Sequence, residues 1–569
     1  MNKRKIRISL PFIFVFFAFG LIEYRLFQLQ IIQHQQFVKK AKREQIRVID
    51  ILPERGIIYD KNFKPLAMNV SSYSLYAHPG KILEPQALAE SLCPILKTDK
   101  SFILKRLKKD RVFVWLARKL SLKEKRKIEN LKLSGIGFVE EEKRFYPQRE
   151  LASHILGFVG VDNQGLSGIE YYYNDKLKGE KGRLLLREDA LGHNIPFTEV
   201  VLKKMVPGES IVLTINSTVQ SIVEQELSLA LEKTKAVSVE ALFINPQTGE
   251  IIALANKPDY DPNNYSRYSS YAIRNRVVQS LYEPGSTFKV ITASALLNKG
   301  VMDVGSKIYC SEFLRVANHT FSDWKRFEKE MSFAQVIYNS SDIGTIKAAL
   351  KMGEKTFYHY ITLFGFGKRT GIDLPGEAKG IVRPPSRWSR IDLPCISIGQ
   401  GIAVTPLQMV VALCSVVNGG KLLRPYVVKS ILNSNGKIVW QNHPVVVRKV
   451  ISSSTSKKMR EILKGVVREG TGKKSQVEGY SIGGKTGTAQ IPSLEKRGYF
   501  PNKYIASFMG FAPVGNPKIA GIVLVKEPAG VYWGGEVAAP VFGKILQRIL
   551  PYLNILPKEE KWVQVREKQ

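Results

Sequence analysis

The chain has 569 residues, of which 44% are hydrophobic and 10% aromatic, so it is too apolar for a disordered protein and long enough for two or three domains. Lys and Arg total 85 against 50 Asp and Glu, which gives a net charge of +35. This excess favours a polyanionic neighbour, such as nucleic acid, an anionic membrane surface or a phosphate-bearing substrate. Charge alone does not choose among them.

The four cysteines and seven histidines do not support a metal centre or a redox motif. The sequence contains no Cys-x-x-Cys pair, and its histidines form no cluster at metal-ligand spacing. We therefore expect no metal and no cofactor. The cysteines are expected to be buried free thiols, because a protein with a core of this size does not need disulfide bonds for stability.

The amino terminus combines a cationic flank (Lys3, Arg4, Lys5 and Arg7) with an apolar run from Leu10 to Ile22. Such a flank stays in the cytoplasm while the apolar run enters the membrane. The run is short for a bilayer span of about 20 residues, but Tyr24 can lie at the far interface. The sequence thus predicts a membrane segment with a cytoplasmic amino terminus.

A cleaved signal peptide is the alternative interpretation of this segment. Ala18-Phe19-Gly20 is a poor cleavage site inside the apolar run, and Glu23 to Ile32 continues with helical spacing. We therefore expect an uncleaved single-pass anchor in the inner membrane. The bulk of the chain then lies outside the cytoplasm, which excludes nucleic acid as its partner.

Four segments are expected along the chain. Residues 1–45 hold the cytoplasmic tip, the anchor and a juxtamembrane helix, residues 46–205 a β-rich first domain, residues 206–555 a second domain, and residues 556–569 a charged tail. Within the first domain, residues 95–130 are basic and show helical apolar spacing, which predicts a small helical lobe.

Ser286 and Lys289 form a Ser-x-x-Lys motif just before an apolar helical run, Val290 to Leu297. A lysine one turn away on the same helix face can take the proton of a serine hydroxyl. Burial and the positive end of the helix favour the neutral amine that this role requires. Four further matches begin at Ser322, Ser434, Ser454 and Ser493, but only Ser286 precedes a helix apolar enough to be buried.

A second motif runs from Gly483 to Ala489 as Gly-Gly-Lys-Thr-Gly-Thr-Ala. Its glycines allow a strand edge to approach a ligand closely, and Lys485 with Thr486 can hold a carboxylate. Residues 479–486 also fit the P-loop pattern of nucleotide binders. A P-loop requires a helix from the lysine onward, whereas the residues that follow indicate a strand and a loop.

The third motif must supply a hydroxyl between the other two. Asn339-Ser340-Ser341-Asp342 stands before the helix-like segment from Ile346 to Leu350, and Ser340 could relay a proton between Lys485 and a leaving group. The alternative interpretation of Ser340 is a helix-capping serine.

In this order and at this spacing, the motifs at Ser286, Ser340 and Lys485 resemble the active-site motifs of class B high-molecular-weight penicillin-binding proteins, and also those of serine β-lactamases. Four further stretches are similar to the same family: Arg55-Gly-Ile-Ile-Tyr-Asp60, Arg144-Phe-Tyr-Pro147, Gly165-Leu-Ser-Gly-Ile-Glu170 and residues 399–408.

The resemblance implies a multidomain α/β fold. An N-terminal transmembrane helix precedes an elongated α+β pedestal of the dimerisation type at residues 46–205. The transpeptidase domain at residues 206–555 is expected to have an antiparallel sheet flanked by helices, as in serine β-lactamases. With no glycosyltransferase-like domain before the pedestal, we expect a monofunctional peptidoglycan D,D-transpeptidase.

The resemblance also implies roles for the site residues. Ser286 would be the nucleophile, Lys289 the base and Ser340 the proton relay. Lys485, Thr486 and Thr488, on the strand that contains Gly487, would clamp the terminal carboxylate. The N–H groups of Ser286 and Thr488 would form the oxyanion hole, and β-lactams would acylate Ser286. Asp342 departs from the Asn of the family, and its carboxylate is expected to oppose the base function of Lys289 by stabilising the ammonium.

The implied substrates and partners are peptidoglycan stem peptides, the lipid-linked wall precursor, a membrane-embedded glycan polymerase and divisome proteins. A division (septal) role is favoured over an elongation-type transpeptidase. Two alternatives of other classes are a β-lactamase, and a non-catalytic β-lactam-binding scaffold or sensor.

Overall fold

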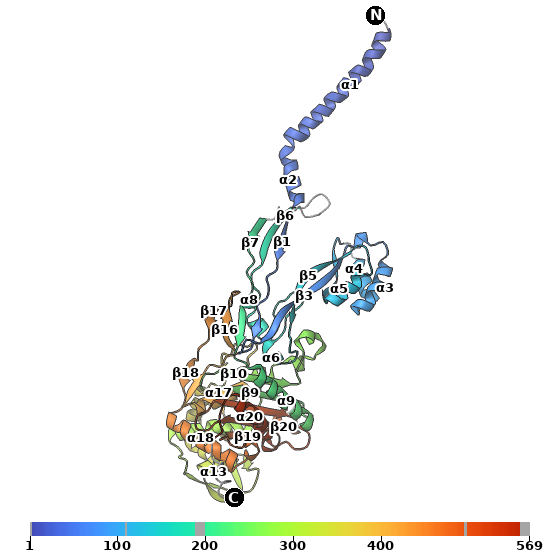
Figure 1. The fold of residues 1–569 in the computed structure, drawn as a ribbon. Helices are drawn as coiled ribbons and strands as arrows, with labels where there is room; N and C mark the ends of the chain where they lie inside the picture. The colour runs from blue at the N-terminus through green and yellow to red at the C-terminus, as the bar shows by residue number, and fades with distance from the viewer. Residues whose placement is uncertain (1–2, 109–110, 188–199, 494–497, 558–569) are drawn as a thin grey trace, which may run out of the picture. The chain divides into compact units, whose positions relative to one another are not determined.

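The computed structural model describes residues 3–108, 111–187, 200–493 and 498–557, so nearly all of the expected tail at 556–569 lies outside the described residues. The chain forms two compact units (Figure 1). The first comprises Met1–Glu54 and Lys178–Gly208, and the second Arg55–Leu177 and Glu209–Gln569. These units cut across the expected domain bounds, which stay a prediction.

The first unit contains the apolar helix and a small sheet. Helix α1 (Lys3–Phe27) continues through the π-helix η1 (Gln28–Ile32), so the helical continuation expected beyond Ile22 is confirmed. Its stretch Pro11–Ile32, 22 residues, is the one segment of the described chain that is long and apolar enough to cross a membrane. The other elements of this unit are α2 (His34–Gln45) and the antiparallel strands β1 (Ile46–Ile51), β6 (Gly182–Arg187) and β7 (Val200–Lys203).

A lobe of three helices and three strands opens the second unit: α3 (Pro85–Leu96), α4 (Lys100–Leu107), α5 (Leu122–Glu129), β3 (Pro65–Ala77), β4 (Val114–Leu120) and β5 (Ile136–Phe145). Strand β3 pairs antiparallel with both β4 and β5. The lobe was expected to be helical through residue 130, and this is wrong for the stretch at 114–120. Val114 and Leu116 are buried two residues apart, a period that defines a strand.

Three of the family-like stretches meet in a buried ion network beside this lobe. Glu170 accepts hydrogen bonds from Arg55 Nε and from Arg144 Nε, each at 2.6 Å, and all three side chains are buried. Arg55 also donates to the carbonyl of Glu170 at 2.8 Å. Although burial raises the pKa of Glu170, the charges of Arg144 and Arg55 lower it by more, so the carboxylate stays ionised.

A five-stranded antiparallel sheet forms the centre of the second unit, in the order β10-β9-β21-β20-β19. Its strands are β9 (Ser238–Ile244), β10 (Ile251–Lys257), β19 (Gly483–Pro492), β20 (Tyr499–Ala512) and β21 (Ile519–Lys526). Helix α9 (Ser217–Thr234) precedes the antiparallel pair β9 and β10 in the chain.

Alternating side chains of this sheet enter two separate cores. In β9, Ala241 and Phe243 pack with α9 and α20 (Ala539–Tyr552), whereas Leu242 and Ile244 pack with α12 (Lys289–Lys299), α17 (Pro406–Val417) and α18 (Ser453–Arg468). Helices therefore cover both faces of the sheet (Figure 1). This arrangement fixes the strand register, because a one-residue slip would exchange the two faces.

A longer sheet, in the order β17-β16-β8-β2-β3-β4, links the two ends of this unit. Strand β8 (Ser210–Leu213) pairs parallel with β2 (Ile58–Tyr59) and antiparallel with β16 (Val428–Leu432), which pairs with β17 (Ile438–Gln441). Next to it, the carboxylate of Asp60 accepts hydrogen bonds from the backbone N–H and the hydroxyl of Ser217 at the start of α9.

The remaining elements of the second unit are η2 (Pro79–Lys81), α6 (Ser153–Leu156), α7 (Gly168–Tyr172), α8 (Asn174–Leu177), η3 (Pro262–Arg267), α10 (Ser270–Ile273), α11 (Arg276–Gln279), η4 (Gly285–Phe288), β11 (Lys307–Cys310), β12 (Phe313–Val316), β13 (His319–Ser322), β14 (Lys329–Ser332), α13 (Phe333–Tyr338), α14 (Asp342–Met352), α15 (Glu354–Leu363), η5 (Pro385–Arg387), α16 (Asp392–Ser397), β15 (Lys421–Leu423), β18 (Val446–Lys449), η6 (Lys473–Ser475) and α19 (Gly534–Val537).

The Glu170 network predicts a large stability loss on neutralisation. Glu170→Gln leaves two buried guanidinium groups without their counter-charge, so the free energy of unfolding is expected to fall by roughly 3–5 kcal/mol at neutral pH. Because the folded-state pKa is lowered, the stabilisation is present above the unfolded carboxyl's value of about 4.3 and is lost as pH falls below it. Denaturant unfolding measures both effects.

The matched control is Glu129→Gln, which removes an exposed ion pair with Lys125 on α5. That pair is expected to contribute about 0.5 kcal/mol or less. Equal losses from the two variants would contradict the structural importance assigned to the buried network.

Candidate functional site

Ser286 lies on a turn that packs directly against β19. The 3₁₀-helix η4 runs into α12, so Ser286 and Lys289 follow each other along one helical path, as expected. Gly285 opens this turn with a φ of +53°, and a Cβ there would lie 3.2 Å from the Cβ of Ala489. The turn thus requires glycine for its backbone conformation, and it brings Ser286 beside the strand that contains Thr488.

The amine of Lys289 is directed toward the neighbouring motif. Its side chain is fully buried, and its Nζ lies 2.6 Å from Asp342 Oδ1, 2.6 Å from the carbonyl oxygen of Ser340 and 3.3 Å from Ser340 Oγ. Ser286 is half-buried, and its hydroxyl makes no hydrogen bond to any described residue. The free hydroxyl is therefore available to a ligand.

Ser340 stands between the two lysines because of an unusual backbone conformation. Its φ is +58°, in the left-handed region that residues other than glycine rarely adopt. The helix-capping role considered for Ser340 belongs instead to Ser341, whose hydroxyl accepts the N–H of Gly344 at the start of α14. The Ser340 hydroxyl is thus free to contact the lysines.

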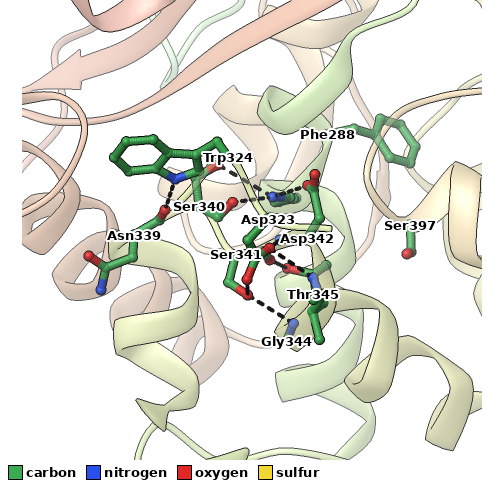
Figure 2. A network of polar contacts seen from close by, with 12 residues as sticks. Phe288, Asp323, Trp324, Asn339, Ser340, Ser341, Asp342, Gly344, Thr345 and Ser397 are labelled. Atoms are coloured by element: carbon green, nitrogen blue, oxygen red, sulfur yellow. Dashed lines mark hydrogen bonds and ion pairs between the residues drawn. The ribbon is translucent and has the colours of Figure 1, made fainter. Parts of the chain in front are cut away.

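Asp323 holds this motif from behind, a contact that the sequence analysis missed. Its carboxylate accepts the Ser341 hydroxyl at 2.7 Å and the backbone N–H groups of Asp342 and Ile343, which are orphan donors of the helix start. Burial raises the pKa of Asp323 by more than these hydrogen bonds lower it. Figure 2 shows Ser341 between Asp323 and the first turn of α14. No motif marks Asp323, which only the β13–β14 connection brings here.

Lys485 approaches Ser340 from the opposite side, on β19. Its Nζ donates to Ser340 Oγ at 2.8 Å and to the carbonyl of Thr486 at 3.0 Å, and its side chain is fully buried. Burial, followed by the charge of Lys289, holds the pKa of Lys485 well below its usual value. Since Lys485 lies in a strand, the P-loop interpretation is wrong.

A cavity of about 560 Å³ opens over these motifs. Every predicted site residue lines it except the two lysines, which are buried behind its wall; the lining set includes Ser286, Ser340, Asp342, Thr486, Gly487 and Thr488. Trp324 and Trp533 form an aromatic wall, with ring centroids 6.5 Å apart. The indole N–H of Trp324 donates to the carbonyl of Asn339 at 2.8 Å, which fixes this wall next to Ser340 (Figure 2).

This arrangement can activate a hydroxyl for attack on a carbonyl. The Ser286 hydroxyl lies on a cavity that the Ser340 hydroxyl also lines, and two buried amines, those of Lys289 and Lys485, contact Ser340. Among the described residues, no group of three or more His, Cys, Asp or Glu side chains could hold a metal ion. The four cysteines are free thiols as predicted, but the expected burial is right only for Cys310 and Cys414, since Cys93 and Cys395 are partly exposed.

Comparison with known families covers both halves of the chain. Residues 239–547 match the penicillin-binding protein transpeptidase domain, and residues 50–213 match the penicillin-binding protein dimerisation domain. The chain belongs to the penicillin-binding protein transpeptidases. The expected fold, an apolar N-terminal helix, a dimerisation-type domain and a transpeptidase domain with an antiparallel sheet between helices, is confirmed.

Similar proteins span almost the same length. The stage V sporulation protein D of Bacillus subtilis is 36% identical over 566 residues, which cover 98% of this chain and 87% of the relative. The peptidoglycan D,D-transpeptidase FtsI of Escherichia coli K12 is 32% identical and covers 93% and 89%. Penicillin-binding protein 3 of Mycobacterium tuberculosis, solved with aztreonam, superimposes with a TM-score of 0.71 at 26% identity and covers 90% and 98%.

Proposed function

We propose that this penicillin-binding protein is a peptidoglycan D,D-transpeptidase that acts through an acyl-enzyme on Ser286 and is covalently inhibited by β-lactams. The observation that supports the assignment best is the convergence of three distant motifs on one cavity, where Ser286 and Ser340 line the wall and Lys289 and Lys485 lie behind it. Helix α1 anchors the protein in the membrane, with a cytoplasmic amino terminus and the bulk of the chain outside.

In the first step, Ser286 Oγ attacks the carbonyl carbon of the penultimate D-Ala of a donor stem peptide, and Lys289 takes its proton. The C–N bond to the terminal D-Ala breaks, and this D-Ala leaves as an amine after receiving a proton through Ser340. The Ser340 hydroxyl suits this relay, because it lies 3.3 Å from Lys289 Nζ and 2.8 Å from Lys485 Nζ.

In the second step, an amine of a neighbouring stem peptide attacks the ester carbonyl, forms the cross-linking amide and returns Ser286 to its hydroxyl form. In both steps the backbone N–H groups of Ser286 and Thr488 stabilise the oxyanion. Loss of one such donor typically costs about 10²–10³ in rate. Lys485 suits proton transfer, since its lowered pKa makes the ammonium form give up its proton more readily than an ordinary lysine does.

Asp342 restrains the resting site. Its carboxylate lies 2.6 Å from Lys289 Nζ, so the amine that must take the proton of Ser286 is held in an ion pair. An amide at this position would keep an acceptor, gain a donor for the substrate and remove the charge.

For the cellular role, we propose septal wall synthesis together with a membrane-embedded glycan polymerase and divisome proteins. The family resemblance favours this role, and two of the similar proteins are the transpeptidase FtsI and a sporulation protein. The lipid-linked wall precursor would be the source of the donor stem peptides.

Ser286→Ala is expected to abolish covalent labelling by a fluorescent penicillin, because its hydroxyl is the proposed attacking group, whereas the Ser340 hydroxyl is held by both lysines. Mass spectrometry of the natural protein should place the adduct on the peptide that contains Ser286. The matched control is Ser454→Ala, which changes an exposed serine of another Ser-x-x-Lys match. Labelling of Ser286→Ala at the natural rate would refute the assignment, and rapid turnover of nitrocefin would indicate a β-lactamase instead.

Asp342→Asn is expected to acylate about tenfold faster than the natural protein, which corresponds to a barrier lower by about 1.4 kcal/mol. The reason is the lost carboxylate beside Lys289. Stopped-flow labelling with penicillin gives the rate, and Asp303→Asn, an exposed carboxylate paired with Lys458, serves as the charge control. If the natural protein acylates as fast as the variant or faster, Asp342 does not restrain the base.

A fluorescent fusion of the full chain is expected to concentrate at midcell during division, because the septal role requires the protein at the division site. Time-lapse microscopy measures this distribution, with the Ser286→Ala chain as a control for effects of activity on placement. A sidewall pattern would favour the elongation-type role.

A further inference from the structure

Among the residues that the structure describes, one cation without a counter-charge lines the cavity beside Ser286. Its charged lining residues are Asp342, Lys473, Lys474 and Glu536. Asp342 pairs with Lys289, and Lys474 pairs with Glu536. Lys473, on the 3₁₀-helix η6, is exposed and has no carboxylate partner among the described residues. The cavity therefore presents an unneutralised positive charge, which attracts an anionic ligand group.

Lys485, the cation expected to clamp a carboxylate, does not reach the cavity. It is fully buried, and its Nζ donates to Ser340 Oγ and to the carbonyl of Thr486. Its lowered pKa also favours the neutral amine. The buried amine of Lys485 thus offers an anion in the cavity no direct access.

Neutral donors for an anion line the same cavity as Lys473. The hydroxyl of Thr488 accepts the N–H of Gly534 at 3.0 Å, so its own hydrogen remains free to donate into the cavity. The hydroxyls of Thr486 and Thr471 lie 2.6 Å apart, and Thr471 precedes Lys473 by two residues. A carboxylate at Thr486 and Thr488 would therefore meet the segment that contains Lys473.

We propose that Lys473 supplies the positive charge that binds the C-terminal carboxylate of the donor peptide, while Thr486 and Thr488 donate hydrogen bonds to the same group. This inference rests on the proposed transpeptidase function. It divides the task expected of Lys485 between two lysines: the buried Lys485 contacts the proton relay, and the exposed Lys473 recognises the substrate. Penicillins have a carboxylate of their own, so the same contact would govern their capture.

The test compares acylation of the full chain by benzylpenicillin and by its uncharged methyl ester. Lys473→Gln is expected to slow acylation by benzylpenicillin about tenfold, as loss of a charge-assisted hydrogen bond predicts, and to leave acylation by the ester nearly unchanged. Lys473→Arg should retain most of the natural rate. Lys457→Gln, an exposed lysine on α18 outside the cavity lining, is the matched control and should behave like the natural protein.

A variant that increases the positive charge of the cavity gives a second test. Glu536→Gln removes the partner of Lys474 and leaves a second free cation at the cavity, so acylation by benzylpenicillin should become faster. An unchanged benzylpenicillin rate in Lys473→Gln would overturn the inference, and so would equal losses with the acid and the ester. If the natural protein forms no adduct with either compound, the proposed function itself fails.

Discussion

Two lysine amines that are both buried against one serine hydroxyl impose the main constraint on this molecule. Lys289 and Lys485 both contact Ser340, and burying an amine without water disfavours its charged form. One carboxylate, Asp342, lies close enough to offset one of the two charges. The result is an asymmetric pair, in which Lys289 has an anionic partner and the pKa of Lys485 is strongly lowered.

The architecture of the second unit holds these three groups in place. Lys485 stands on a sheet whose register is set by two cores, Lys289 on a buried helix, and Ser340 on a left-handed residue before a capped helix. A displacement of β19 by one residue would turn Lys485 to the opposite face of the sheet. The chemistry of the site thus depends on packing that extends well beyond the cavity.

Local patterns in the sequence were sufficient to predict that the three motifs meet at one cavity, and they indicated several of the elements. The spacing of Ser286 and Lys289 sets them one turn apart in any helix, and the glycines around Lys485 indicated a strand. Contacts between segments that are far apart in the chain could not be predicted from the sequence. Asp323 supports Ser341 only because a β connection returns it to α14, and the cap fell on Ser341 because the backbone at Ser340 is left-handed.

The same limit explains why residues 114–120 were wrongly expected to be helical and why the positive charge of the cavity was not predicted. The stretch from Val114 became a strand because β3 offered it a pairing edge, a tertiary effect that a basic composition hides. No sequence pattern marks Lys473, because it is one lysine among many in a basic chain. Its charge becomes notable only once the structure shows that the neighbouring Lys474 is paired with Glu536.

Strand β8 has a consequence for how the chain must be made. It pairs with β2, where Ile58 lies opposite Ile211, and with β16, where Leu213 lies opposite Val428, so both of its partners come from distant parts of the chain. During synthesis, the early strands therefore emerge long before their partners exist, and their open edges stay liable to wrong pairing. Such distant pairings also slow folding. A truncation before β16 would therefore be expected to impair the assembly of the N-terminal portion, and not merely to delete the late segments.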